Sequence, residues 1–405
     1  MEKLIVLGSS GSIGTQALDV AKRYNLPVDA ISVNTSVRLL CEQVRAFSPR
    51  YAIVANEEAY KEAKTMLADT SVTLFCGKEG IGEVLSLSDA DTVLNALVGE
   101  AGLRPTVWTL ENGKRLALAN KESLVCAGDI VMKLAAEKGL EILPVDSEHC
   151  AIHQCLRAGA RHEAKELILT ASGGPFFGYS EEALENVTLE DTLKHPTWKM
   201  GQKITVDSAT LMNKGFELIE AAHLFGFDMD DISAVVHRES IIHSMVRFED
   251  NSVIAQMGNP DMRSCIAYAL FYPERRFTGG APLDFASLGK MTFFEPDTKT
   301  FPLLALAKEV HTAGGLLPAV LNAANEEAVY AFLAKKIGFA DIGHIVSDFV
   351  HSYENKANPT LDEIENASQT VRRQIRAMLA EKQSGIVFYG YSLCNSHVWF
   401  SHYHS

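Results

Sequence analysis

Short runs of apolar, mostly β-branched residues alternate with longer segments of helical spacing along the first third of the chain. The segments 37–47 and 57–67 repeat apolar residues three and four positions apart, which is typical of helices that cover a sheet. Strands that alternate with helices predict a parallel, doubly wound α/β sheet. We expect its strands at Leu4–Leu7, Val28–Val33, Ala52–Val54, Val72–Phe75, Thr92–Ala96, Arg115–Ala119 and Glu141–Leu143.

The pattern changes farther along the chain and divides the sequence into regions. Polar and aromatic residues crowd the middle of the chain, which predicts a central α+β catalytic domain. Amphipathic helical spacing then returns and predicts a C-terminal helical domain. We expect a first domain at 1–147, the central domain at 148–282, a linker at 283–302 and the helical domain at 303–383. The aromatic and histidine-rich segment 384–405 is interpreted as a non-catalytic extension, with a metal-binding His cluster as the alternative.

Composition narrows the possible partners. The chain has 405 residues and a formal net charge of −14, so it lacks the basic surface that holds a nucleic-acid backbone. No uncharged apolar window reaches the ~18 residues of a membrane span, and the first residues lack the features of an export signal. Seven scattered cysteines without a C-x-x-C pair are typical of reduced thiols. We therefore expect a cytoplasmic protein that binds neither nucleic acid nor membrane.

A glycine-rich turn follows the first predicted strand. Gly8, Gly11 and Gly14 are spaced G-x-x-G-x-x-G, and the helical run 15–23 follows directly. Such a turn presents free N–H groups and the positive end of a helix dipole to a pyrophosphate. A dinucleotide site is the favoured interpretation, and a merely tight strand–helix turn is the alternative.

The end of the second predicted strand bears on the choice of dinucleotide. It ends in Asn34, Thr35 and Ser36, without the acidic residue that would bind a ribose 2′-hydroxyl and repel a 2′-phosphate. This absence favours NADP over NAD. Arg38 is the nearest cation for that phosphate, and a solvated arginine on a helix face is an equal alternative.

Acidic residues near the last predicted strand suggest a metal site. Asp146 and Glu148 follow that strand, where ligands bind in parallel sheets. Farther on, Asn213, Lys214 and Glu217 share one helix face, although the spacing alone favours an ordinary intrahelical ion pair between Lys214 and Glu217. Oxygen-rich surroundings favour Mg²⁺ or Mn²⁺. His149 and His153, also one helical turn apart, lack the H-E-x-x-H pattern of a zinc site.

The segment 195–203 combines a large aromatic residue, a thioether and cations without a core period. This composition suits a lid that closes over a ligand and excludes water. A surface loop with a packed tryptophan is the alternative.

These motifs resemble one family, the 1-deoxy-D-xylulose 5-phosphate reductoisomerases of the non-mevalonate isoprenoid pathway. The similarity extends from Met1 to about Lys382 and leaves the tail outside. The matching strings are GSSGSIGTQALDV, ALANKESLV, LPVDSEHCAI, TASGGPF, HPTWKMGQKITVDSATLMNKGFELIEA, IIHSMVRFEDNSVIAQMGNPDMR and LNAANEEAV.

The resemblance implies an NADPH-dependent enzyme with a Rossmann-like first domain. Its reaction would rearrange and reduce 1-deoxy-D-xylulose 5-phosphate to 2-C-methyl-D-erythritol 4-phosphate. It implies Asp146, Glu148 and Glu217 as ligands of one Mg²⁺ or Mn²⁺, and these residues with Lys121 as the catalytic set. Substrate would contact Lys121, Ser147, Glu148, Ser172, His195, Trp198, Met200, Ser208, Asn213, Lys214 and Glu217, of which Trp198 and Met200 resemble lid residues. The cofactor would contact Ser10, Gly11, Ser12, Ile13, Asn34, Thr35, Ser36, Asn120, Glu122 and Gly201. The family also implies a homodimer.

The sequence departs from the family at Asn34, Thr35 and Ser36, where a glycine followed by a basic or small polar residue is frequent. No cation stands at these positions, so the strength of the NADPH preference stays open. Two rival functions also stay open. A related dehydrogenase of the homoserine-dehydrogenase type would share the nucleotide domain but need no metal, and a dinucleotide-sensing protein would show no turnover.

Overall fold

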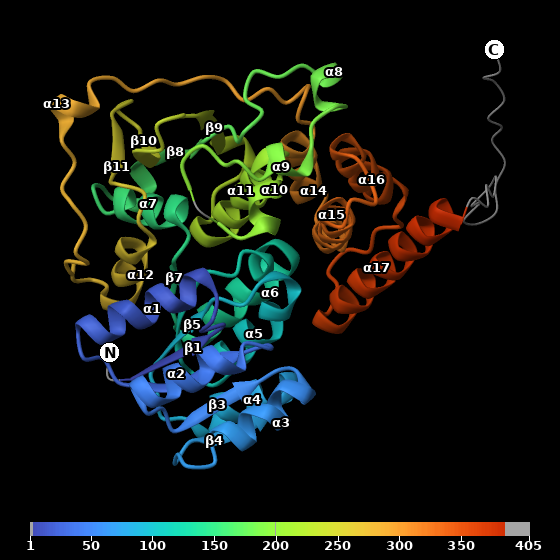
Figure 1. The fold of residues 1–405 in the computed structure, drawn as a ribbon. Coiled ribbons are helices and arrows are strands. Elements are labelled where there is room, and N and C mark those ends of the chain that lie inside the picture. Colours follow the sequence, from blue (N-terminus) through green and yellow to red (C-terminus); the bar gives the residue numbers. More distant parts are fainter. Residues whose placement is uncertain (1–2, 199, 385–405) are drawn as a thin grey trace.

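The computed structural model describes residues 3–198 and 200–384, and its first third forms a seven-stranded parallel sheet (Figure 1). The strand order is β4-β3-β2-β1-β5-β6-β7, so the chain builds outward from β1 and then returns to build on its other side. This reversal places a ligand-binding crevice at the carboxyl ends of β1 and β5. The strands are β1 (Leu4–Leu7), β2 (Val28–Val33), β3 (Tyr51–Val54), β4 (Thr73–Cys76), β5 (Thr92–Asn95), β6 (Arg115–Leu118) and β7 (Ile142–Pro144).

Helices cover both faces of this sheet because alternate strand residues point to opposite sides. Leu4 and Val6 pack in a cluster with residues of α1, α2 and α3, whereas Ile5 and Leu7 pack against α4. The predicted α/β class and doubly wound sheet are confirmed. The helices are α1 (Ser12–Arg23), α2 (Val37–Phe47), α3 (Glu57–Met66), α4 (Gly77–Leu87), α5 (Leu103–Glu111) and α6 (Glu122–Lys138), with the short η1 (Gly99–Gly102) before α5.

The middle of the chain forms a second, four-stranded sheet in the order β11-β10-β8-β9. β10 runs antiparallel to both β11 and β8, and β8 runs parallel to β9. The long crossover from β8 to β9 carries the helices α10 and α11 over the crevice of the first sheet (Figure 1). The bounds are β8 (Ala164–Ala171), β9 (Ile232–Val236), β10 (Ile242–Phe248) and β11 (Val253–Met257) for the strands, and α7 (Ser147–Leu156), α8 (Glu181–Leu184), α9 (Leu189–Thr192), α10 (Gln202–Ala209) and α11 (Met212–Phe225) for the helices, with η2 (Arg161–Glu163) and η3 (Met229–Asp231) between them.

Helix α12 (Met262–Phe271) shows that sequence order and spatial order differ. It follows the second sheet in the chain, yet its residues Ile266 and Leu270 are fully buried in the core of the first sheet, beside α1. The chain thus returns to the first sheet after building the second one.

The C-terminal region is helical, as the spacing predicts, and its helices gather along one side of the molecule (Figure 1). Helix α15 is buried along most of its length and packs against α16, α17, α6 and α10. The helices are α14 (Leu303–Ala313), α15 (Leu317–Leu333), α16 (Phe339–Ser352) and α17 (Leu361–Ser384), and the expected linker runs alongside the second sheet after α13 (Phe285–Leu288). The segment 385–405 lies outside the described residues. Among the described helices, none is both long and apolar enough to cross a membrane.

Candidate functional site

A cavity of about 730 Å³ opens where the first sheet, the second sheet and the β8–β9 crossover meet. All of the predicted substrate and metal residues line it, together with part of the glycine turn. The predicted residues in its walls are Ser12, Ile13, Lys121, Asp146, Ser147, Glu148, Ser172, His195, Trp198, Met200, Gly201, Ser208, Asn213, Lys214 and Glu217. Ser10, Gly11, Asn34, Thr35, Ser36, Asn120 and Glu122 lie outside its walls.

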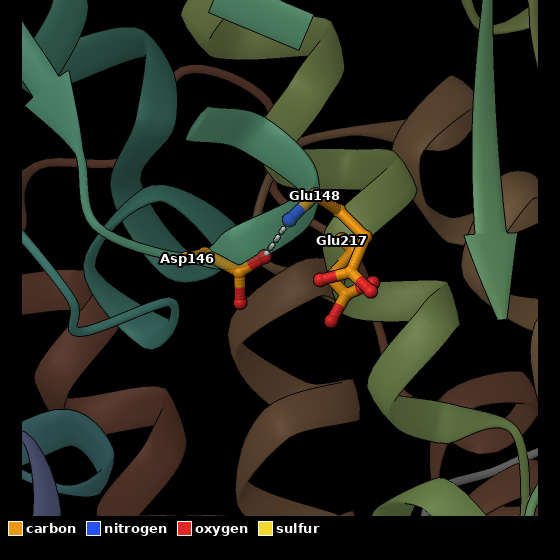
Figure 2. Close-up of side chains that lie close together, drawn as sticks. All are labelled: Asp146, Glu148 and Glu217. Atoms are coloured by element: carbon orange, nitrogen blue, oxygen red, sulfur yellow. Dashed lines mark hydrogen bonds between the residues drawn. The ribbon is translucent and has the colours of Figure 1, made fainter. Parts of the chain in front are cut away.

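Three carboxylates converge on one side of the cavity (Figure 2). Asp146 caps the start of α7, where its Oδ1 accepts a hydrogen bond of 3.2 Å from the backbone N–H of Glu148. Glu217 approaches from α11, and one carboxylate oxygen of each residue lies within 4.8 Å of the others. An all-oxygen donor set of this compactness fits a hard divalent cation such as Mg²⁺ or Mn²⁺.

Two lysines balance part of this negative charge. Lys121 Nζ lies 2.5 Å from Asp146 Oδ2 and 2.6 Å from Glu217 Oε1. Lys214 pairs with Glu217 on its own helix and lies 3.5 Å from Glu148 Oε1. The intrahelical ion pair therefore exists, but it forms part of the cavity wall and is joined to residues from other elements.

The negative charge that the two lysines leave unbalanced affects Glu148 most. Burial raises the pKa of Asp146, but the charges of Lys121 and His149 outweigh it and hold that pKa well below its usual range. Burial and the neighbouring Glu217 raise the pKa of Glu148 to about 8, against the weaker influence of Lys214. The charge of a bound cation would relieve this crowding, so the electrostatics of the residues present agree with a metal site.

The two histidines of α7 do not converge on a common point. His149 is fully buried; its Nε2 donates to the backbone carbonyl of Glu217 at 2.8 Å, and its Nδ1 lies 3.1 Å from Glu220 Oε2. His153 faces the hydroxyl of Tyr268 at 2.7 Å instead. This geometry gives no zinc site at these two residues.

Sequence reasoning missed Glu220. Burial raises the pKa of this carboxyl to about 8, although nearby His149 lowers it. Glu220 stands three positions after Glu217 on the same helix, and that spacing was the available signal.

Donor groups occupy the part of the cavity next to the second sheet. His195 Nδ1 accepts backbone hydrogen bonds from Thr197 at 3.2 Å and Trp198 at 2.9 Å, so the ring proton lies on Nε2. Nε2 then donates to Ser172 Oγ at 3.0 Å, and that oxygen also accepts from the N–H of Gly174 at 3.2 Å. With both acceptor positions used, the Ser172 hydroxyl retains its own proton for a ligand.

The predicted lid forms another wall of the cavity. Trp198 is half-buried, and its ring centroid lies 6.0 Å from that of His243, which also lines the cavity. Met200 and Gly201 follow it in the wall, while Lys199 lies outside the described residues.

The glycine turn is packed tightly at two of its three glycines. Gly8 has a φ of +82°, and a Cβ there would lie 2.7 Å from the carbonyl oxygen of Ala96. A Cβ on Gly14 would lie 2.1 Å from the carbonyl oxygen of Gly8. At Gly11 the nearest atom would be 3.4 Å away, so the fold itself does not require glycine at this exposed position. Because α1 begins at Ser12 without a side-chain cap, its first N–H groups stay available for an anion.

The proposed 2′-phosphate region is exposed. Asn34, Thr35, Ser36 and Arg38 all face solvent. In the part of the chain that the structure describes, the side chains of these residues make no hydrogen bond or ion pair.

Asn120 and Glu122 are buried in a polar network at the start of α6. Asn120 Nδ2 donates to the carbonyl oxygens of Leu97 and Gly99 at 2.8 Å each. Glu122 accepts from Asn120 at 3.1 Å and lies 3.3 Å from Lys203 Nζ. These two residues therefore tie the ends of β5 and β6 to the first turn of α10.

The same network reaches the C-terminal helices. Lys203 Nζ lies 2.8 Å from Asp207 Oδ2, and Asp207 Oδ1 accepts from Asn325 of α15 at 2.8 Å. Burial lowers the pKa of Lys203, but the carboxylates of Asp207 and Glu122 outweigh it and raise that pKa above its usual range. Sequence reasoning assigned no role to these three residues. The polar position of Asn325 inside the apolar helix string LNAANEEAV was the available signal for that residue alone.

A glycine turn at the switch point of a doubly wound sheet, facing a carboxylate triad, is typical of dinucleotide-dependent enzymes that also use a metal ion. Three family models match the chain. They describe 1-deoxy-D-xylulose 5-phosphate reductoisomerase over residues 4–128 and C-terminal domains of that enzyme over residues 142–225 and 257–374. The chain belongs to the 1-deoxy-D-xylulose 5-phosphate reductoisomerase family, and the resemblance drawn from the sequence motifs is confirmed.

Relatives and solved structures agree with this assignment. The 1-deoxy-D-xylulose 5-phosphate reductoisomerase of Caldanaerobacter subterraneus is 50% identical over 93% of this chain and 98% of its own length. The Zymomonas mobilis enzyme in complex with NADPH is 41% identical, with a TM-score of 0.87 over 93% of this chain and 99% of that one. A reductoisomerase in complex with NADPH, fosmidomycin and magnesium is 38% identical, with a TM-score of 0.89 over 95% of this chain and 99% of that one.

The glycine turn leads to a first prediction. Gly14→Ala should lower the free energy of unfolding by about 2–3 kcal/mol, because its Cβ collides with backbone. Gly11→Ala should change that free energy by less than about 1 kcal/mol. The same Gly11→Ala variant should weaken binding of NADPH by about 10-fold or more, because the methyl group lies where a phosphate approaches.

Denaturant unfolding gives the two stabilities, and NADPH fluorescence titration gives the affinity. Equal stability of the two variants would show that the packing at Gly14 is not tight.

Proposed function

We propose that this chain converts 1-deoxy-D-xylulose 5-phosphate to 2-C-methyl-D-erythritol 4-phosphate with NADPH and a divalent metal ion, in isoprenoid precursor biosynthesis. The observation that carries the proposal is the carboxylate triad in the same cavity as the start of α1. Family membership supports it, as do the NADPH and magnesium complexes of similar enzymes.

Asp146, Glu148 and Glu217 would hold Mg²⁺ or Mn²⁺. A divalent ion bound there supplies Lewis-acid stabilisation of negative charge on substrate oxygens. Lys121, within 2.6 Å of both Asp146 and Glu217, lies where it can donate hydrogen bonds to the reacting hydroxyl groups. Its position between two carboxylates keeps this lysine charged, with a pKa well above its usual value despite burial.

The substrate phosphate would be bound between the 172–174 turn and the start of α11, where Asn213 and Lys214 also contact Glu217. Ser172, Ser208, Asn213 and Lys214 provide hydroxyl and amide donors and one cation, which complement a phosphate dianion. His195 donates its N–H to Ser172 Oγ, which leaves the proton of the Ser172 hydroxyl for the phosphate. Ser147 would lie beside the metal ligands, where its hydroxyl donates to Glu148 Oε2 at 2.7 Å.

The cofactor would bind along the first domain. Ser10, Gly11, Ser12 and Ile13 would contact the pyrophosphate from the start of α1. Asn34, Thr35 and Ser36 would face the adenosine ribose, and Asn120, Glu122 and Gly201 would border the nicotinamide end. Trp198 and Met200 would cover the substrate as a lid.

We also propose that the protein is a homodimer in the cytoplasm. Its regions would have the functions expected from the sequence. Residues 1–147 would bind cofactor, 148–282 would hold metal and substrate with a lid at 195–203, and 283–302 would connect them to the helices of 303–383.

The carboxylate triad gives the decisive test. Asp146→Asn, Glu148→Gln and Glu217→Gln should each reduce turnover of 1-deoxy-D-xylulose 5-phosphate by at least about 100-fold, because each removes a metal ligand. Turnover is followed by the loss of NADPH absorbance, with and without metal. NADPH affinity should stay within about 2-fold of wild type, because the glycine turn is a separate structure.

Chelator should abolish wild-type turnover, and Mg²⁺ or Mn²⁺ should restore it better than Ca²⁺, whose bonds are longer. Full activity in any two variants would contradict the metal assignment. Metal-independent turnover would favour a related dehydrogenase, and NADPH binding without turnover would favour a sensing protein.

The lid assignment predicts a coupled kinetic defect. Trp198→Ala should raise KM for the substrate and lower kcat, each on the order of 10-fold, because it removes both coverage and water exclusion. Protease should cleave between His195 and Lys203 in the free enzyme, and substrate with NADPH should suppress that cleavage. Equal cleavage in both states would identify a static surface loop.

The exposed Arg38 tests cofactor choice. Arg38→Ala should weaken NADPH binding about 10- to 150-fold and leave NADH binding unchanged, because only NADPH carries a 2′-phosphate for a charge-assisted contact. Equal losses for both cofactors would make Arg38 structural. Equal use of both cofactors by the wild type would contradict a 2′-phosphate site at 34–36.

A further inference from the structure

The turn after β8 brings two serines of the cavity together. Gly173 and Gly174 follow Ser172 with φ values of +78° and +66°, which reverse the chain toward α10. A Cβ on Gly174 would lie 2.8 Å from the carbonyl oxygen of Ser208, so the turn packs directly against the end of α10. The positions of Ser172 and Ser208 therefore depend on the shape of this turn.

Arg238, just after β9, holds the turn from behind. Its Nη1 donates to the carbonyl oxygen of Ser172 at 2.6 Å and to that of Gly174 at 2.7 Å. The guanidinium also lies over the ring of Phe177, 5.0 Å from its centroid. One nitrogen thus bridges both ends of a glycine-rich turn that would otherwise be free to change shape.

The charge of Arg238 also acts on the ring that contacts Ser172. Burial and the charge of Arg238 lower the pKa of His195 to about 4. His195 therefore stays neutral at physiological pH and donates its one N–H to Ser172, while Arg238 adds fixed positive charge behind the turn. The fixed charge of Arg238 favours an anion at this end of the cavity, and the neutral ring keeps Ser172 oriented.

We propose that Arg238 is a positioning residue for anion binding: by clamping the 172–174 turn it aligns Ser172 and Ser208 toward the phosphate of the substrate. Arg238 itself does not line the cavity, so it acts through the turn. The identity of the anion rests on the proposed function, whereas the clamp does not.

The variant Arg238→Met removes both hydrogen bonds and keeps an apolar stem over Phe177. In the enzyme loaded with metal and NADPH, it should raise KM for 1-deoxy-D-xylulose 5-phosphate and Kd for inorganic phosphate about 10- to 100-fold. The value of kcat and the Kd of NADPH should stay within about 3-fold of wild type, because the turn contacts neither the metal ligands nor the glycine turn. Arg238→Lys, which keeps the charge and can donate to one carbonyl, should restore part of the loss.

Arg161 offers a matched control. Its Nη2 donates to the carbonyl oxygens of Phe225 and Gly226, and its guanidinium lies 3.8 Å from the ring centroid of Phe227, outside the cavity. Arg161→Met should therefore leave KM and phosphate affinity unchanged. Equal effects of the two methionine variants, or equal losses of kcat and NADPH affinity in Arg238→Met, would overturn the proposal.

Two further outcomes are distinguishable. If Arg238→Met does not fold, Arg238→Lys decides: an unchanged phosphate affinity overturns the clamp, and a loss of about 3- to 10-fold supports it. If the wild type fails to turn over the sugar phosphate, the proposed function is wrong, and the phosphate titration still tests the clamp.

Discussion

The burial of several carboxylates in one place is the constraint on which the rest of this structure depends. Asp146, Glu148 and Glu217 are brought within 4.8 Å of one another, and such crowding is tolerated only with nearby positive charge. Lys121 arrives from the end of β6 and Lys214 from α11, so the charge balance joins the first sheet to the crossover of the second. The same ion pairs that shape the cavity thus connect the first sheet to the β8–β9 crossover.

A second polar connection runs behind the cavity. Glu122, Lys203, Asp207 and Asn325 link the start of α6, the helix that follows the lid, and the buried helix α15. Because α15 packs against both α6 and α10, the C-terminal helices support α10, whose residues Ile204 and Ser208 line the cavity. The helical region thus supports the site from outside, since none of its described residues lines the cavity.

The sequence predicts those parts of the fold that depend on local pattern. β1, β2 and α2 begin and end where the apolar spacing predicts, because strand and helix periodicity is a property of neighbouring residues. The family resemblance likewise implied Asp146, Glu148 and Glu217 as one set of metal ligands, and the structure brings these three carboxylates together. Arg238, Lys203 and the buried position of α12 were not predictable, because each depends on partners far away in the chain. A hydrogen bond from an arginine side chain to a distant backbone carbonyl leaves no pattern in the sequence around either residue.

The exposed end of β2 has a consequence for how this enzyme can diverge. Asn34, Thr35 and Ser36 are exposed and do not pack in the core, and their side chains form no described hydrogen bond or ion pair. Substitutions at these positions are therefore nearly neutral for folding, in contrast to substitutions at Gly8 or Gly14. Under the proposed cofactor assignment, lineages can alter the coenzyme they use through drift and selection at three surface codons, while the reaction centre stays under its own separate constraint.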